Sequence, residues 1–127
     1  MKNLTLFFLV TACCFNFKIF AQDLDQFQLQ SGFQIEIFAS DLDSPRQMAE
    51  GKNGVIFVGE RGGQIIALSD SDGNGQADSK RIIAENLTYS TGVSIFEGDL
   101  YFSEISKIWK IKDIESWLQK NNCWKYK

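Results

Sequence analysis

The hydrophobic residues of this chain are distributed as expected for short strands separated by tight turns. Residues 33–38 alternate apolar and polar side chains in their first half, and residues 107–111 alternate again. Further short runs are rich in β-branched and aromatic residues: residues 55–58, 64–68, 82–84 and 100–102. Clusters of Gly, Asn and Asp separate these runs at residues 52–54, 61–63, 72–75 and 97–99. The pattern predicts an all-β chain.

One segment near the C-terminal end has helical spacing instead. Asp113 suits the N-cap position, and Ile114, Trp117 and Leu118 follow at positions i, i+3 and i+4 of one helix face. We therefore expect a single short helix over residues 113–120.

The strand pattern occurs twice. Residues 37–42 align with residues 82–87 at an offset of 45, residues 54–60 with 98–104 at 44, and residues 64–68 with 107–111 at 43. Each unit contains successive short strands, with a Glu at the exit of one of them. Periods of about 40–45 residues with several short strands are typical of β-propeller blades. Chance alignment of two β-rich stretches is the alternative, but the order is kept across three separate segments.

The chain length bears on this interpretation. A propeller closes with four to eight blades, which takes roughly 180 to 350 residues, whereas this sequence has 127. Two blades alone would leave unpaired strand edges and a one-sided core. We therefore expect a partial β-propeller of about two four-stranded blades, the N-terminal fragment of a larger protein.

The N-terminal residues have the pattern of an export signal. Lys2 precedes an apolar run too short to span a bilayer, and Ala21 precedes a polar stretch. The preferred division is a signal peptide over residues 1–21, a lead-in over 22–32 and the partial propeller over 33–127. A lipoprotein signal with the lipid on Cys13, or an uncleaved anchor, are the alternatives. Each of them exports the chain to the periplasm or outside the cell.

Composition excludes several kinds of chemistry. With 13 Lys and Arg against 16 Asp and Glu, the net charge is -3, so nucleic acid is a poor partner. The sequence has no His, which removes imidazole general bases and His-ligated metal sites. Cys123 is the single cysteine beyond the predicted signal, so no disulfide framework is expected.

A short acidic stretch has the spacing of a calcium-binding loop. Side-chain oxygens fall at loop positions 1, 3, 5 and 9, position 7 offers a backbone carbonyl, and Gly75 at position 6 permits the sharp turn. The predicted ligands are Asp70, Asp72, Asn74, Gln76 and Asp78. Position 12 departs from the pattern, because Arg81 stands where a bidentate Glu is usual. An ion-free hairpin turn rich in Asp and Asn is the alternative.

Five segments together resemble a known family of secreted enzymes. They are residues 32–39, 42–49, 58–65, 70–78 and 98–106, and the resemblance extends over roughly residues 29–118. These segments are similar to the opening of glucose/sorbosone-type sugar dehydrogenases that use pyrroloquinoline quinone. The resemblance implies a six-bladed propeller that holds the quinone on its axis with calcium beside it. It also implies that a sugar or aldehyde is oxidised.

The resemblance assigns few site residues. It matches Glu60 and Arg61 to a Glu-Arg pair near the cofactor, where a guanidinium suits the quinone carboxylates. The alternative for Arg61 is a solvated turn residue. It places Thr91 in a stretch that faces the cofactor pocket, although the family often has Pro-Asn-Gly-Val where this chain has Ser90 to Val93. No catalytic residue is assigned, because the family's general base is a His.

Two functions are therefore expected. The first is an N-terminal fragment of an exported, quinone-dependent sugar or aldehyde dehydrogenase that is inactive alone and does not hold the quinone firmly by itself. The second is a non-catalytic exported β module that binds calcium through residues 70–78.

Overall fold

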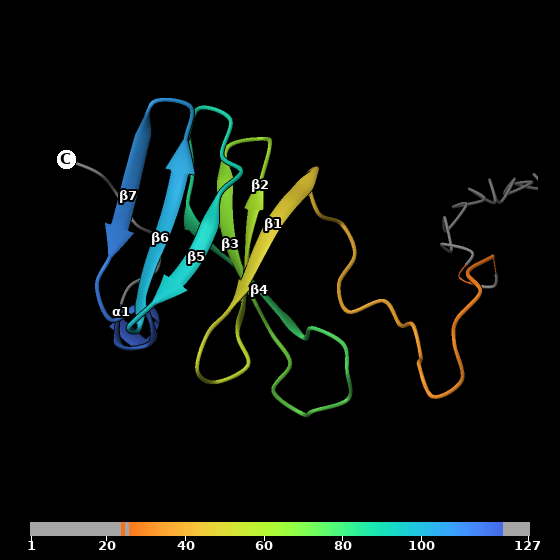
Figure 1. The fold of residues 1–127 in the computed structure, drawn as a ribbon. Helices are drawn as coiled ribbons and strands as arrows, with labels where there is room; N and C mark the ends of the chain where they lie inside the picture. Colours follow the sequence, from red (N-terminus) through yellow and green to blue (C-terminus); the bar gives the residue numbers. More distant parts are fainter. Residues whose placement is uncertain (1–23, 25, 121–127) are drawn as a thin grey trace, which may run out of the picture. The chain divides into compact units, whose positions relative to one another are not determined.

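A computed structural model describes residue 24 and residues 26–120 of the chain (Figure 1). The chain divides into two units, one ending at Ile35 and one beginning at Glu36. The described part of the first unit contains two turns closed by main-chain hydrogen bonds, from Phe27 N to Leu24 O and from Phe33 N to Gln30 O. All strands and the helix found among the described residues belong to the second unit.

The first four strands form one antiparallel meander, here named sheet A, in which each strand pairs with the next along the chain. Its strands are β1 (Pro45–Glu50), β2 (Ile56–Glu60), β3 (Gln64–Ser69) and β4 (Ser79–Ala84). The next three strands form a second meander, sheet B, in the order β5-β6-β7. Its strands are β5 (Val93–Phe96), β6 (Asp99–Glu104) and β7 (Lys107–Ile111). The all-β prediction is confirmed.

The predicted repeat is present in the strand register. In sheet A, Val58 lies between Met48 and Ile66. In sheet B, Phe102 lies between Val93 and Trp109. Met48 and Val93 are 45 residues apart, Val58 and Phe102 are 44 apart, and Ile66 and Trp109 are 43 apart. The offsets of 44 and 43 are the same as those that aligned the sequence segments containing these residues. The two sheets therefore repeat one three-strand unit with the same pairing.

The loops that lead into the two sheets share their backbone conformation as well. Asp41 and Ser44 have φ values of 57° and 54°, and Asn86 and Tyr89 have φ values of 61° and 58°. Both pairs lie 45 residues apart, and a left-handed conformation is uncommon for residues other than Gly. Matching strained positions in the two lead-in loops are further support for a true repeat.

The main hydrophobic core lies between the two sheets. Sheet A contributes Phe57, Ile65 and Ala67, and sheet B contributes Leu100 and Phe102 among other buried side chains. The opposite face of sheet A has a second, smaller core of Val58, Ile66 and Leu68, which Phe38, Ala39 and Leu42 cover. Side chains alternate between these two faces, as the period of two along a strand requires.

The sheets stack head to tail. The repeat offsets match Val58 and Leu68 of the outer core of sheet A to Phe102 and Ile111, which face sheet A from sheet B. Each sheet thus turns the same face toward the N-terminal side of the stack. In such a heterologous stack each contact joins two different faces. The face of sheet B that points away from sheet A therefore has no further sheet packed on it among the described residues.

Helix α1 (Ile114–Lys120) follows β7. Asp113 is its N-cap, since Asp113 Oδ1 accepts a hydrogen bond from Ser116 N at 3.4 Å. Ile114 is buried, and Trp117 and Leu118 pack against the main core. The expected helix and its apolar face are confirmed. Sheet B has three strands within the described residues. By the offset of 43, α1 corresponds to residues 71–77 in the turn before β4, and the expected fourth strand of the second blade falls beyond residue 120, outside the described residues.

One predicted strand is absent from the described structure, and two observed strands were not predicted. Residues 33–38 contain no strand in the described structure. Phe38 packs its side chain on sheet A, and its carbonyl accepts a bond from Ala77 N, but residues 33–38 join no strand ladder. The two strands that were not predicted are β1 and β5. Strand β5 has only four residues, and β1 is mostly exposed and has no apolar alternation. Its pairing with β2 makes it a strand.

Candidate functional site

The acidic turn between β3 and β4 brings three predicted ligands together. One carboxylate oxygen from each of Asp70, Asp72 and Asp78 lies within 4.8 Å of the other two. Asp72 and Asp78 are exposed and Asp70 is partly buried. Carboxylates at this spacing repel one another, so a cation or protons would stabilise the arrangement. Calcium takes six to eight hard oxygen ligands, and this cluster supplies three carboxylates toward that number.

Asp70 organises the turn. Its Oδ2 accepts a hydrogen bond from Gly75 N at 2.9 Å, and its Oδ1 accepts one from Gly73 N at 2.8 Å. These bonds stabilise the charged carboxylate and lower its pKa, Gly75 most strongly. Gly75 has a φ of +86°, as predicted for the sharp turn at position 6.

The other predicted ligands are held differently. The side-chain amide of Asn74 donates to Asp72 Oδ2 at 3.0 Å, while its oxygen accepts from Gln76 N at 2.8 Å. Asp78 Oδ2 accepts from Ser71 N at 3.0 Å and also from the Ser71 hydroxyl. Arg81, at position 12, lies in β4 and its guanidinium donates to the carbonyl of Leu118 in α1.

A further carboxylate lies close to the turn. Glu36 Oε2 is 3.3 Å from the place that a Cβ on Gly75 would occupy. Glu36 precedes the turn by more than thirty residues, and no spacing rule for a local loop includes so distant a residue. Sequence reasoning therefore missed it.

Glu60, a predicted cofactor contact, is only 1% exposed. Its Oε1 accepts a hydrogen bond from Asp43 N at 2.9 Å. The repeat counterpart, Glu104, likewise accepts from Thr88 N at 2.8 Å, and Thr88 lies 45 residues after Asp43. The Glu at the strand exit therefore fixes the lead-in loop of each unit, which is a structural role common to both.

Arg61 and Thr91 lie at the same end of the sheets. Arg61 is exposed, and its guanidinium carbon is 4.6 Å from the centroid of the Tyr89 ring, a cation–π contact. Thr91 follows Tyr89 by two residues and is partly buried. Between them, the Ser90 hydroxyl is buried and has no hydrogen-bond partner among the described residues. The contact between Arg61 and Tyr89 joins the turn of one unit to the lead-in loop of the next.

Several sequence predictions lie outside the described residues. These are the signal peptide over residues 1–21, the alternative lipid site at Cys13, and the single thiol at Cys123. Among the described residues, no helix is long and apolar enough to cross a membrane.

Comparison with known proteins identifies one family. A family model described as a domain of unknown function (DUF7133) matches residues 20–116. The chain belongs to the DUF7133 family. The match spans both sheets and the acidic turn, so the repeat unit and its turn are parts of one DUF7133 domain. A search of curated proteins found no match to the chain.

Proposed function

We propose that this DUF7133 domain forms the first two blades of an exported β-propeller dehydrogenase that oxidises a sugar or aldehyde with pyrroloquinoline quinone. The head-to-tail stacking of two like sheets carries the proposal. A stack that repeats one face-to-face contact closes only when further sheets complete a ring, which is the architecture of a propeller.

The outward face of sheet B supports the same proposal. By the repeat offsets, Tyr101 and Ile108 stand where Phe57 and Ile65 of sheet A contact sheet B. Ile108 is 78% exposed and Phe96, on the same face, is 61% exposed. Exposed apolar side chains at positions that are buried in the preceding unit fit a face that receives another sheet.

The quinone contacts proposed for this region are Arg61 and Thr91, with Glu60 holding the loop beside them. Arg61 has a planar guanidinium at an exposed turn, suited to paired hydrogen bonds with a carboxylate. Glu60 acts on the cofactor only indirectly, because its carboxylate is buried against Asp43 N. The bound quinone would accept the hydride, while these residues would orient it.

The test measures quinone binding by the full chain in the presence of calcium. Quenching of tryptophan fluorescence is the readout. We expect only weak quinone binding, because two blades supply few of the contacts of a complete ring. Arg61→Ala is expected to weaken it further, and Arg46→Ala, an exposed arginine in β1, is expected to leave it unchanged. Dye reduction with D-glucose is expected to be absent, since the sequence has no His to act as general base. Equal binding by the two variants, or none by the wild type, would contradict the assignment.

A second candidate is a non-catalytic exported module that binds calcium. The observation that favours it is the cluster of Asp70, Asp72 and Asp78. In this candidate the ion neutralises the three carboxylates and holds the long turn between β3 and β4 in one conformation.

Calorimetric titration with calcium tests the second candidate. We expect saturable heat for the wild type and for Glu85→Ala, an exposed acid outside the turn, and loss of that heat for Asp72→Ala. Identical heats for all three proteins would discard the calcium site. Calcium binding without any quinone binding would favour this candidate over the first.

A further inference from the structure

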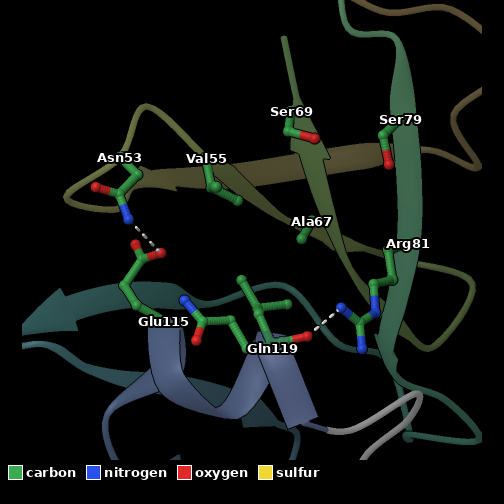
Figure 2. A pocket seen from close by; sticks show the side chains of 9 residues that line it. Asn53, Val55, Ala67, Ser69, Ser79, Arg81, Glu115 and Gln119 are labelled. Carbon is green, nitrogen blue, oxygen red and sulfur yellow. Dashed lines mark hydrogen bonds between the residues drawn. The ribbon is translucent and has the colours of Figure 1, made fainter. Parts of the chain in front are cut away.

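A cavity lies at the end of sheet A opposite to the turn that holds Arg61. It has a volume of about 270 Å³ and lies between sheet A and α1 (Figure 2). Its walls come from the turn before β2, the C-terminal end of β3, the first half of β4 and one face of α1. The cavity is therefore separate from the proposed quinone contacts by the length of β2.

Two charged side chains are fixed on opposite sides of this cavity. Glu115 of α1 accepts hydrogen bonds from Lys52 N and Asn53 Nδ2, each at 3.1 Å. Arg81 of β4 donates to the carbonyl of Leu118. Figure 2 shows the bond from Asn53 and the bond from Arg81, which tie α1 to sheet A on either side of the cavity. The formal charges of Glu115 and Arg81 cancel, so the cavity favours neither an anion nor a cation by its net charge.

The cavity retains a large capacity for hydrogen bonds. A carboxylate offers about four lone-pair sites and a guanidinium five N–H groups. The bonds described above use two of these sites on Glu115 and one N–H group of Arg81. The described structure gives no side-chain partner to Ser69, Ser79 or Gln119, which also line the cavity. Donors and acceptors are thus interspersed around one small space.

The floor of the cavity is apolar. Val55, Ala67 and Leu118 line it, and Val55 and Leu118 pack against the main core. Hydroxyl groups both donate and accept, while the C–H faces of a ring are apolar, so a polyhydroxylated ring matches the mixed walls and the floor. A cavity of this volume is at the small end of the range for ligand sites.

We propose that this cavity binds a small neutral polyol, with Glu115 and Arg81 accepting from and donating to its hydroxyls. This inference does not rest on the proposed dehydrogenase function, because no quinone contact lies in the cavity. The cavity is small and open to solvent, so we expect affinity in the millimolar range.

The test is a titration of the ¹⁵N-labelled full chain with myo-inositol as the polyol. Amide chemical shifts report binding. Sodium acetate and glycine serve as the anionic and zwitterionic probes. We expect saturable shifts at Asn53, Ser69 and Gln119 with inositol alone. Gln119→Trp, which fills the cavity from an exposed helix position, is expected to weaken inositol binding about tenfold or more.

Lys120→Trp is the matched control, since Lys120 is the next residue of α1, is exposed and does not line the cavity. It is expected to bind inositol as the wild type does, and the unperturbed shifts of the sheet amides report that each variant is folded. Saturable shifts with acetate or glycine in place of inositol would overturn the ligand class. No saturable shift in the wild type, or equal binding by both Trp variants, would overturn the site.

Discussion

Sheets A and B share one pairing scheme but differ at the face that sheet A turns toward sheet B. At this face, sheet A has Phe57 and Ala67, which are buried in the core. The corresponding positions of sheet B hold Tyr101 and Lys110, and Lys110 Nζ lies 5.1 Å from the Tyr101 ring centroid. Lys110 also bonds Asp99 at 2.5 Å.

This difference shows that the pairing register of a strand and the burial of its side chains are set independently. Backbone pairing sets which residues of a strand lie opposite one another, and it is the same in both sheets. The neighbour that covers a face sets how much apolar surface is removed from water, and hence how costly a substitution is. Matched substitutions in the two sheets can test this separation.

The largest effect is expected for the matched pair Phe57→Ala and Tyr101→Ala. Phe57 is fully buried between the sheets, so its truncation is expected to destabilise the fold by about 3–5 kcal/mol. Tyr101 is partly exposed, and its truncation is expected to cost no more than about 1 kcal/mol. Urea unfolding followed by far-ultraviolet circular dichroism measures both. Equal losses would show that the face of sheet B is covered in solution.

The next effect concerns the turn between the second and third strands of each unit. Gly63 has a φ of +96°, and a Cβ there would lie 2.3 Å from the carbonyl oxygen of Leu87. Gly63→Ala is therefore expected to destabilise by more than about 2 kcal/mol. Its counterpart Ser106 is exposed, so Ser106→Ala is expected to be within about 0.5 kcal/mol of the wild type. Thermal unfolding distinguishes these expectations, and a neutral Gly63→Ala would contradict the close approach of Leu87.

A smaller effect is expected from pH. The hydrogen bond from Thr88 N, that from Trp109 Nε1 and the charge of Lys107 lower the pKa of Glu104 below its ordinary value of 4.5. A carboxyl whose pKa is lower in the folded state stabilises the fold above its unfolded pKa. This stabilisation is lost as the pH falls through the folded value.

Glu104→Gln is therefore expected to destabilise most above pH 4.5 and to approach the wild type in more acidic solution. Unfolding midpoints measured across this pH range provide the comparison. Thr88→Ala keeps the backbone N–H that bonds Glu104, so it is expected to retain the wild-type pH dependence. A constant difference between Glu104→Gln and the wild type at all pH values would refute the account.

The smallest effect is expected for Lys110→Ala. The hydrogen bond and charge of Asp99 raise the pKa of Lys110, but the Lys110 side chain is 38% exposed, and exposed ion pairs contribute little. We expect a small decrease in the unfolding midpoint that disappears in high salt, because salt screens the pair. A large, salt-independent loss would mean that this face is buried against a neighbour.

Much of the local structure could be predicted from the sequence. The β-rich runs, the strand over residues 107–111, the N-cap at Asp113 and the repeat offsets follow from side-chain period and turn residues. Of the candidate site, the clustering of Asp70, Asp72 and Asp78 was predicted, because alternate residues of a tight turn point to one side.

Other features needed the folded chain. Nothing in the composition of Pro45–Glu50 marks β1 as a strand, since its neighbour β2 supplies the pairing. Glu36 lies beside the acidic turn, and Glu115 faces Arg81 across the cavity, through contacts between distant segments. Single-sequence patterns contain no information about such pairs.

The sequence by itself determined the period of the strands, the order of the two units and the turns between them. These depend on local backbone preferences and on alternation of side chains, which act over a few residues. The tertiary structure decided which face of each sheet is buried and which side chains meet at its ends. Burial depends on the neighbour that excludes water, and that neighbour comes from residues remote in the chain.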